Sequence, residues 1–167
     1  MNKIIITGPE SSGKTTLSND LKKYFNTNLV TEYAREYIDK LNSKYNYEDL
    51  LKIAKQQLKN ENKTQLTTPL ICDTDLITIK IWSEYKYSKC DTWILQHIKK
   101  QKNESRFYLL CKPDLEWKYD PQRENQFDRK AIFDIYKDEL EALNHQYFVI
   151  NSHDRLNKAI KALKKII

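Results

Sequence analysis

The sequence predicts an α/β fold in which a parallel β-sheet is covered by helices on both faces. Two observations lead to this prediction. Short apolar runs alternate with segments of helical spacing along the whole chain, and strands that alternate with helices form parallel sheets. A loop that contains both glycines of the chain joins the first apolar run to the first helical segment. With 167 residues, of which 40% are hydrophobic, we expect a single domain, residues 1–167, with a sizeable core.

Five short apolar runs are the strand candidates. They are residues 3–7, 28–31, 69–72, 106–111 and 146–150. Apolar residues at helical spacing fill the segments between these runs. The expected helices are residues 15–25, 33–41, 47–62, 75–86 with 91–102, 128–143 and 153–165. Because ligands bind beyond the carboxyl ends of parallel strands, the polar residues after each run are the candidates for a functional site.

Residues 8–15 read Gly-Pro-Glu-Ser-Ser-Gly-Lys-Thr and match the phosphate-binding pattern G-x-x-x-x-G-K-[ST]. The chain has only 2 glycines, Gly8 and Gly13, and both lie where this pattern requires the backbone to turn. In such a loop the backbone amides surround phosphates, the lysine places a positive charge beside them, and the hydroxyl of Thr15 can bind Mg²⁺. A purely structural glycine turn would not explain the full pattern. The sequence therefore predicts ATP and Mg²⁺ as ligands. The expected ATP-binding residues are Gly8, Glu10, Ser11, Ser12, Gly13, Lys14, Thr15 and Thr16.

Acidic residues follow two of the apolar runs. Glu32 could accept the proton of a substrate hydroxyl or bind ribose hydroxyls, and the alternative is a helix N-terminal glutamate stabilised by the helix dipole. Asp73 could hold the metal-bound water of a Mg²⁺–triphosphate, so Asp73 and Thr15 are the expected metal site. Asp75 either caps the helix that follows it or contacts the substrate.

Cationic and aromatic side chains lie near the same strand ends. Arg35 could pair with Glu32 or bind phosphate. Arg123 and Arg129 flank a polar segment and could neutralise charge on a transferred phosphoryl group, the alternative being a solvated charged loop. Several aromatic residues could stack on a planar base, and we favour two of them over Trp82, Tyr85 and Tyr119. The favoured residues are Tyr33 and Trp117.

Composition narrows the classes of partner. The net charge of +6 is compatible with an anionic ligand, but no stripe of interleaved basic and aromatic residues indicates a nucleic-acid surface. No apolar run reaches the roughly 18 residues of a membrane span. The three cysteines lack the spacing of metal ligands, and Cys72 and Cys111 end apolar runs as buried thiols would. The chain starts directly in its first expected strand, so we expect no signal peptide and a cytoplasmic protein.

These blocks of sequence resemble the ribosylnicotinamide kinase domain of NadR-type proteins. The resemblance covers nearly the whole chain. It includes residues 8–17, 31–37 (Thr-Glu-Tyr-Ala-Arg-Glu-Tyr), 73–75 (Asp-Thr-Asp) and 80–83, and then Asp114, Trp117, Asp120 and Arg123. Its most specific parts are the blocks at residues 32–37 and 73–75. It implies a three-layer P-loop NTPase fold with sheet order 2-3-1-4-5 and a nucleoside-kinase-like lid at about 117–130.

The resemblance also implies a reaction, the phosphorylation of the 5′-hydroxyl of nicotinamide riboside by ATP to give nicotinamide mononucleotide for NAD synthesis. The segment after Ile150 would then lie near adenine. We expect catalytic roles for Lys14, Glu32, Asp73, Arg123 and Arg129. The expected substrate contacts are Glu32, Tyr33, Arg35, Asp75, Trp117 and Asp120.

The sequence departs from the pattern of this family in several places. Pro121 stands where we expect glycine, Asn151-Ser152 replaces a glycine after the last strand, and Thr31 stands where an aromatic residue could stack on the pyridine. An N-terminal adenylyltransferase domain is not expected either, so adenylyl transfer and repression are not inferred. The expectation is a 5′-kinase of a nucleoside-like metabolite, with nicotinamide riboside as the expected acceptor.

Three alternatives remain open. The chain could phosphorylate another nucleoside or a polynucleotide 5′-end, it could be an ATP-binding regulatory module that acts through a protein partner, or it could be an inactive relative. The intact loop of residues 8–15 argues against the last of these.

Overall fold

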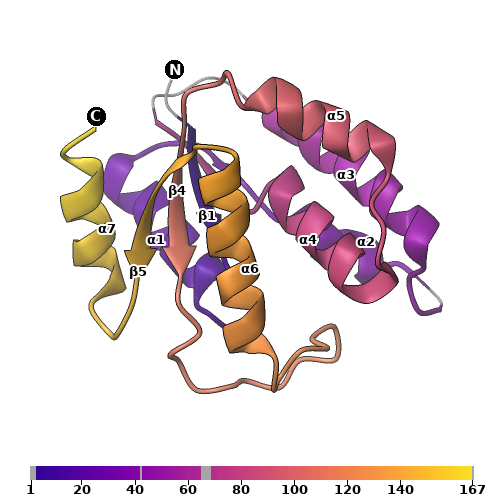
Figure 1. Cartoon of the computed structure of the whole chain (residues 1–167). Helices are drawn as coiled ribbons and strands as arrows, with labels where there is room; N and C mark the ends of the chain where they lie inside the picture. Colours follow the sequence, from indigo (N-terminus) through magenta and orange to yellow (C-terminus); the bar gives the residue numbers. More distant parts are fainter. Residues whose placement is uncertain (1–2, 42, 65–68, 167) are drawn as a thin grey trace.

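A computed structural model gives the structure of the chain and describes residues 3–41, 43–64 and 69–166. All the expected strands and helices occur, with ends shifted by at most two residues (Figure 1). β2 is shorter than expected because it pairs with its neighbour only at Leu29 and Val30. The elements in chain order are β1 (Lys3–Thr7), α1 (Lys14–Phe25), β2 (Leu29–Val30), α2 (Tyr33–Asp39), α3 (Tyr47–Lys63), β3 (Leu70–Asp73), α4 (Leu76–Tyr87), α5 (Thr92–Gln101), β4 (Arg106–Cys111), α6 (Arg129–Ala142), β5 (Gln146–Ile150) and α7 (Arg155–Leu163).

The five strands form one sheet in the order β2-β3-β1-β4-β5, and every pairing is parallel. β1 is central: Ile5 lies opposite Cys72 of β3 on one side and Tyr108 of β4 on the other. The apolar run of β1 is fully buried because the strand has a neighbour on both edges and helices on both faces. The predicted fold class and sheet order are therefore confirmed.

Alternate strand residues point to opposite faces, so the sheet has two separate cores. Ile4 and Ile6 of β1 pack with Leu17 and Leu21 of α1 and with Leu163 of α7. The intervening strand residues pack against the other helices, α2 to α6. Figure 1 shows α1 and α7 on one side of the sheet and α4 and α6 on the other. The helices thus cover both faces, which leaves the ends of the strands as the places where a ligand can reach the sheet.

A buried ion network lies between β4 and the helices that cover it. The Arg106 side chain is fully buried, pairs with Glu61 of α3 and lies 3.3 Å from the Asp75 carboxylate. Asp75 also accepts hydrogen bonds from the Tyr108 hydroxyl (2.8 Å) and the Ile77 amide (3.0 Å). Burial raises the pKa of the Asp75 carboxyl, and the charge of Arg106 opposes this rise. The network therefore fixes the first turn of α4 to the sheet.

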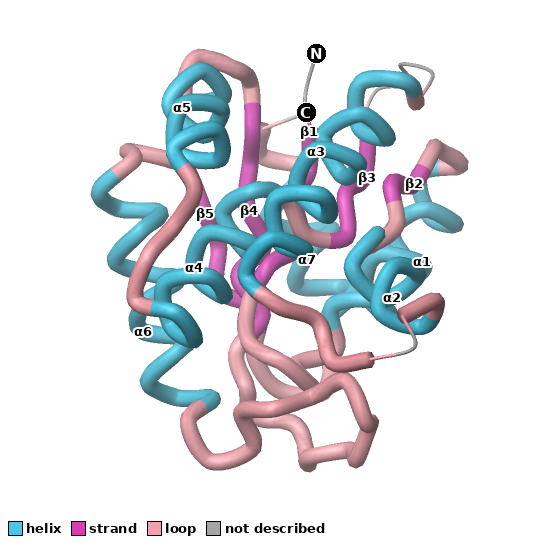
Figure 2. The backbone as a smooth tube through the Cα atoms, turned by 90° about the vertical axis from the view of Figure 1, so that its right-hand side faces the viewer, coloured by secondary structure: helices cyan, strands magenta, loops and turns pink. Residues whose placement is uncertain are grey.

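The loops that follow the strands gather at one edge of the sheet. Figure 2 shows them together below the strands, at the end of the molecule away from both chain termini. They include the β1–α1 loop (residues 8–13) and the longer β4–α6 loop (residues 112–128). This is the carboxyl edge of a parallel sheet, where ligands bind in open α/β folds.

Candidate functional site

The β1–α1 loop needs both of its glycines. Gly8 has φ +132°, and a Cβ atom there would lie 2.5 Å from the carbonyl oxygen of Cys111. Gly13 has φ +79°, and its Cβ would lie 3.0 Å from a methyl group of Leu115. Gly13 is the N-cap residue of α1 and makes no side-chain cap. The first amides of α1 therefore remain available to an anion in the loop.

Polar side chains of the loop fix its shape from within. The Ser12 hydroxyl and the Lys14 ammonium both donate to the carbonyl oxygen of Pro9, at 2.7 and 2.8 Å. A lysine ammonium has three donors, so Lys14 keeps donors for other oxygens while it holds this carbonyl. These internal hydrogen bonds fix the shape of the loop and hold the Lys14 ammonium against it.

A cavity of about 270 Å³ opens from this loop. One end consists of residues 8–16. The other end is a wall built from α2, α4 and α6 and the residues that precede α2, and the β4–α6 loop contributes to the remaining side. The residues beyond 8–16 that line the cavity are Glu32, Ala34, Arg35, Ile38, Thr78, Ile81, Trp82, Tyr85, Leu115, Glu116, Lys118, Gln122, Arg123, Asn125, Ile132 and Tyr136.

Two carboxylates lie where the β1–α1 loop, which we call the phosphate loop, meets the wall formed by the helices. Glu32 lines the cavity, and its burial raises the pKa of its carboxyl while the charge of Lys14 opposes the rise. Asp73 is 2% exposed, and burial also raises the pKa of its carboxyl against the opposing charge of Lys14 and a hydrogen bond from Thr15. The Oδ1 atom of Asp73 is buried and has no hydrogen-bond partner. An unpartnered carboxylate oxygen beside a threonine hydroxyl fits the oxygen ligands that Mg²⁺ requires.

The β4–α6 loop is docked on the phosphate loop. The Glu10 carboxylate accepts hydrogen bonds from the amides of Glu124 (3.0 Å) and Asn125 (2.9 Å). The Ser11 hydroxyl accepts from the Lys118 amide at 3.0 Å. On another side, Arg35 of α2 pairs with Asp120 at 2.9 Å. The β4–α6 loop is therefore attached to both the phosphate loop and α2 across the cavity.

We expect Glu10→Ala to release the β4–α6 loop. Hydrogen bonds between a charged and a neutral group contribute roughly 1.5 kcal/mol each, so the amides of Glu124 and Asn125 should exchange about tenfold faster with solvent. Hydrogen exchange followed by mass spectrometry measures this rate. Glu116→Ala is the matched control because the Glu116 side chain takes no part in the contacts above. Equal exchange in wild type and Glu10→Ala would show that Glu10 does not hold the loop.

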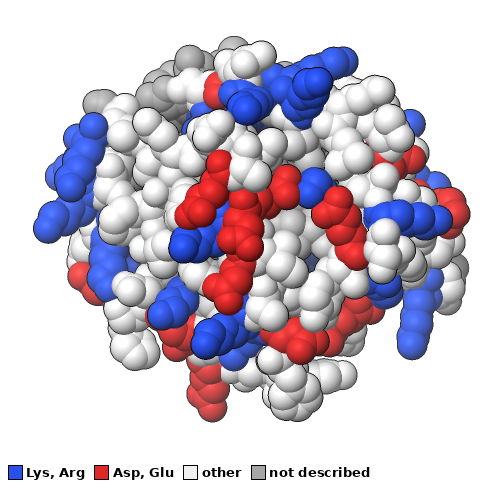
Figure 3. Space-filling view, in the orientation of Figure 1, with Lys and Arg blue, Asp and Glu red and all other residues white. Residues whose placement is uncertain are grey.

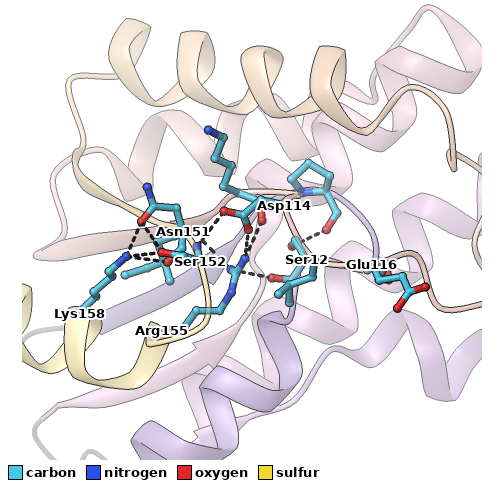
Figure 4. Close-up of polar contacts among 12 residues, drawn as sticks. Ser12, Asp114, Glu116, Asn151, Ser152, Arg155 and Lys158 are labelled. Carbon is cyan, nitrogen blue, oxygen red and sulfur yellow. Dashed lines mark hydrogen bonds and ion pairs between the residues drawn. The ribbon is translucent and has the colours of Figure 1, made fainter.

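A second group of contacts braces the phosphate loop from the β5 side (Figure 4). Arg155, the first residue of α7, donates to the carbonyl oxygens of Ser12 (3.0 Å) and Lys112 (3.0 Å) and pairs with Asp114. Asp114 in turn accepts from the Ser152 amide at 2.8 Å. One arginine thus connects the phosphate loop to the ends of β4 and β5. Sequence reasoning missed Arg155, although it follows the last strand as the other site residues follow theirs.

The cavity brings together most of the residues predicted to form the site. Besides residues 8–16, it is lined by Glu32, Arg35 and Arg123, and Asp73 lies beside Thr15. The other predicted residues do not line it. The Tyr33 amide donates to Gln57, and its ring packs near Tyr37. Six predicted residues are not among those that line the cavity: Asp73, which lies beside Thr15, and Tyr33, Asp75, Trp117, Asp120 and Arg129.

These outlying residues have structural contacts of their own. Of the two roles expected for Asp75, helix capping and substrate contact, the structure has the first: Asp75 caps α4, and its side chain is fully buried in the ion network. The Trp117 ring packs against the guanidinium groups of Arg123 and Arg129, 5.9 and 5.4 Å from its centroid. Arg129 also donates to the carbonyl oxygens of Ser11 (3.3 Å) and Leu115 (3.1 Å). The aromatic residues at the cavity are instead Trp82, Tyr85 and Tyr136.

Other classes of site find less support in the part of the chain that the structure describes. Within residues 3–41, 43–64 and 69–166, no helix is long and apolar enough to cross a membrane. Among the same residues, no group of three or more histidine, cysteine, aspartate or glutamate side chains could hold a metal ion. On the face shown in Figure 3, cationic and acidic side chains are interspersed and do not form one basic patch.

The parallel sheet order and the loop of residues 8–15 between β1 and α1 define a P-loop nucleotide-binding fold. The chain belongs to the AAA domain family, whose model matches residues 3–158. It is 26% identical over 177 residues to the trifunctional NAD biosynthesis/regulator protein NadR of Salmonella typhimurium. That alignment covers 98% of this chain and 42% of the relative, so the chain spans less than half of the relative's length.

Solved structures show the same fold. A crystal structure of a NadR protein in complex with NR matches with a TM-score of 0.79 and 19% identity, over 98% of this chain and 51% of that chain. Deoxyadenosine kinase from M. mycoides matches with a TM-score of 0.61 and 16% identity, over 98% of this chain and 100% of that chain. The chain therefore has a P-loop fold of the kind found in nucleoside kinases, and the similarity to NadR-type proteins is confirmed.

Proposed function

We propose that this chain transfers the γ-phosphoryl group of ATP to the 5′-hydroxyl of a nucleoside, with nicotinamide riboside as the expected acceptor. One observation carries the proposal. A single cavity joins the phosphate loop to a wall of apolar and aromatic side chains, with Glu32 between them. Such a cavity can hold a triphosphate at one end and a nucleoside at the other, with the reacting groups at the carboxylate. The similarity to NadR supports nicotinamide riboside as the nucleoside.

The charges around the cavity favour an acceptor without a phosphate group. Four cationic residues are among those that line it, and three of them, Lys14, Lys118 and Arg123, lie on the phosphate loop or the β4–α6 loop. The fourth, Arg35, belongs to the wall formed by α2, α4 and α6, which we call the acceptor wall because the nucleoside would bind there. Arg35 is paired with Asp120. A monophosphate acceptor would need cations free to bind it, whereas the acidic Glu32 would repel it. A neutral or cationic nucleoside meets neither obstacle.

The residues at the junction have distinct roles in this proposal. Lys14 offsets the charge that develops on the transferred phosphoryl group, and Arg123 adds a second cation from the β4–α6 loop. Thr15 and Asp73 would hold Mg²⁺, which neutralises and orients the triphosphate when bound. Glu32 orients the 5′-hydroxyl and accepts its proton, for which a carboxyl with a raised pKa is better suited. Arg129 positions the β4–α6 loop through its contacts with backbone carbonyls.

The test is ADP release from ATP and Mg²⁺ in the presence of a panel of nucleosides, with mass detection of the product. We expect nicotinamide riboside to be converted to its mononucleotide faster than ordinary ribonucleosides. Phosphorylation of another nucleoside would keep the reaction class and overturn the choice of acceptor. Failure of every nucleoside to stimulate ADP release would overturn the kinase proposal and favour a nucleotide-binding regulatory module.

Asp73→Asn separates a metal role from a structural one. We expect turnover to fall by about 100-fold or more and half-saturation by Mg²⁺ to move to higher concentration, because the amide is a weaker ligand than a carboxylate. Without metal, the variant should be at least as stable as wild type. Burial raises the pKa of the Asp73 carboxyl, which means that the charged carboxylate destabilises the folded state, and asparagine carries no charge. Mg²⁺ titrations of activity and thermal unfolding measure the two effects.

The exposed Asp134 on α6 supplies the control, because Asp134→Asn makes the same chemical change at a solvent-exposed position, whereas Asp73 is buried beside Thr15. This control should have the Mg²⁺ dependence of wild type. If Asp73→Asn lost stability but kept its Mg²⁺ dependence, Asp73 would be a structural residue and not a metal ligand.

A further inference from the structure

Tyr136 brings a hydroxyl group to the part of the cavity wall that α4 and α6 form. It belongs to α6, is only 4% exposed and lines the cavity. The same two helices also contribute Thr78, Trp82 and Tyr85 to the lining, together with Ile81 and Ile132, which offer no hydrogen bond. A hydroxyl in such a place either serves the packing of the helices or faces the ligand. Its contacts distinguish these two roles.

A chain of hydroxyl groups connects Tyr136 to β1. The Tyr136 hydroxyl interacts with Thr78 of α4. The Thr78 hydroxyl lies 3.1 Å from that of Thr7, the last residue of β1, and both threonine side chains are buried. If each hydroxyl donates to the next, from Thr7 to Thr78 to Tyr136, the phenolic proton remains free for the cavity. With this order of donors, the chain would leave the Tyr136 hydroxyl as a donor at the cavity, and it would tie that hydroxyl to β1, the strand that precedes the phosphate loop.

The charges around this hydroxyl determine what it can bind. Burial raises the pKa of the Tyr136 phenol, the interaction with Thr78 opposes this rise, and the nearby acidic groups Glu32, Asp75 and Glu10 add to it, so the phenol keeps its proton. A protonated phenol donates to a carbonyl, ether or hydroxyl oxygen. The same carboxylates disfavour a phosphate or carboxylate at this position. The matching ligand group is therefore an uncharged oxygen.

We propose that Tyr136 is a specificity-determining residue that donates a hydrogen bond to an uncharged oxygen of the acceptor nucleoside. This inference rests on the proposed function, because it assigns the wall of α2, α4 and α6 to the acceptor. The sequence did not single out Tyr136 because nothing local distinguishes it from the other tyrosines of the chain. Its role depends on how α6 packs against α4 and β1.

Tyr136→Phe removes the hydroxyl and keeps the ring. We expect the KM of the best nucleoside of the panel to rise about tenfold, as for the loss of one hydrogen bond in a buried site, while the KM of ATP stays within about twofold of wild type. Thr78→Val, which removes the support of the hydroxyl, should shift the same KM in the same direction by a smaller factor. Tyr147→Phe is the control, because the Tyr147 hydroxyl donates to Glu141 at 2.6 Å outside the cavity.

Analogues of the nucleoside that each lack one oxygen identify the group that Tyr136 contacts. One analogue should lose affinity with wild type but lose little more with Tyr136→Phe, since the two deletions remove the same bond. Calorimetric binding of the nucleosides without ATP gives the same comparison independently of turnover. If wild type phosphorylates a nucleoside and Tyr136→Phe has an unchanged KM for it, the inference is wrong and the proposed function stands. If wild type neither binds nor phosphorylates any nucleoside, both are wrong.

Discussion

Lys14→Ala should reduce turnover by about 100- to 1,000-fold and leave the chain folded. The ammonium of Lys14 lies at the mouth of the phosphate loop, 2.8 Å from the Pro9 carbonyl, and is the cation of that loop which lines the cavity. Removing a group that stabilises charge developing in the transition state has an effect of roughly this size. The measurement is ADP formation in a single turnover, with enzyme in excess over ATP.

The fold should tolerate this substitution. Lys14 is the first residue of α1, where alanine is a good helix former, and the contact of its ammonium is with one loop carbonyl. Lys22→Ala, at the exposed end of the same helix, makes an equal change of charge and should leave turnover unchanged. Near-normal turnover of Lys14→Ala with a normal unfolding temperature would mean that the loop does not act on a phosphoryl group.

The parts of the site that sequence reasoning predicted are those fixed by local pattern. The phosphate loop is a contiguous motif, and its two glycines have the positive φ angles that the pattern requires. Glu32 lies two residues after the end of β2 and Asp73 is the last residue of β3, so the edge of the sheet that they occupy follows from the fold. The central strand β1 was predicted with its observed bounds because its three isoleucines, Ile4 to Ile6, form a fully buried apolar run between Lys3 and Thr7.

The acceptor wall could not be predicted in this way, since it depends on how three helices pack. Tyr33 and Trp117 follow strands as Glu32 does, yet their side chains pack against neighbouring residues outside the cavity. Trp82, Tyr85 and Tyr136 lie within helices whose apolar pattern is equally consistent with a closed core. Asp75 could not be placed from the sequence either, although it is only two residues after Asp73. Thr74 has φ +69°, which redirects the backbone and turns Asp75 toward Arg106.

The second large effect is expected for Arg106→Leu, which should lower the free energy of unfolding by about 3–5 kcal/mol. The Arg106 side chain is fully buried, and its removal would leave the Asp75 carboxylate without a cation. Glu61 would keep Lys3, whose ammonium lies 2.6 Å away. Most of the loss should therefore come from Asp75. Urea denaturation at pH 7 measures it, and the exposed substitution Lys130→Leu should change the same free energy by less than about 0.5 kcal/mol.

The loss of stability should depend on pH in a direction that the network fixes. Burial already raises the pKa of Asp75 in the folded protein, and Arg106 opposes this rise. Without Arg106 the folded pKa rises further above the unfolded value, so the variant gains stability by binding a proton as the pH falls. The difference in unfolding free energy between wild type and Arg106→Leu should thus be largest at neutral pH and smaller toward pH 5.

The double variant Arg106→Leu/Asp75→Asn tests that cause directly. Asparagine retains an oxygen that can accept the hydrogen bond from the Ile77 amide, and it brings no charge into the interior. We expect the double variant to recover part of the lost stability and to lose the extra pH dependence. Were the deficit of Arg106→Leu the same at pH 5 and pH 7 and unaffected by Asp75→Asn, the lost packing of the arginine stem would be responsible. The first turn of α4 would then be held by packing and not by the ion network.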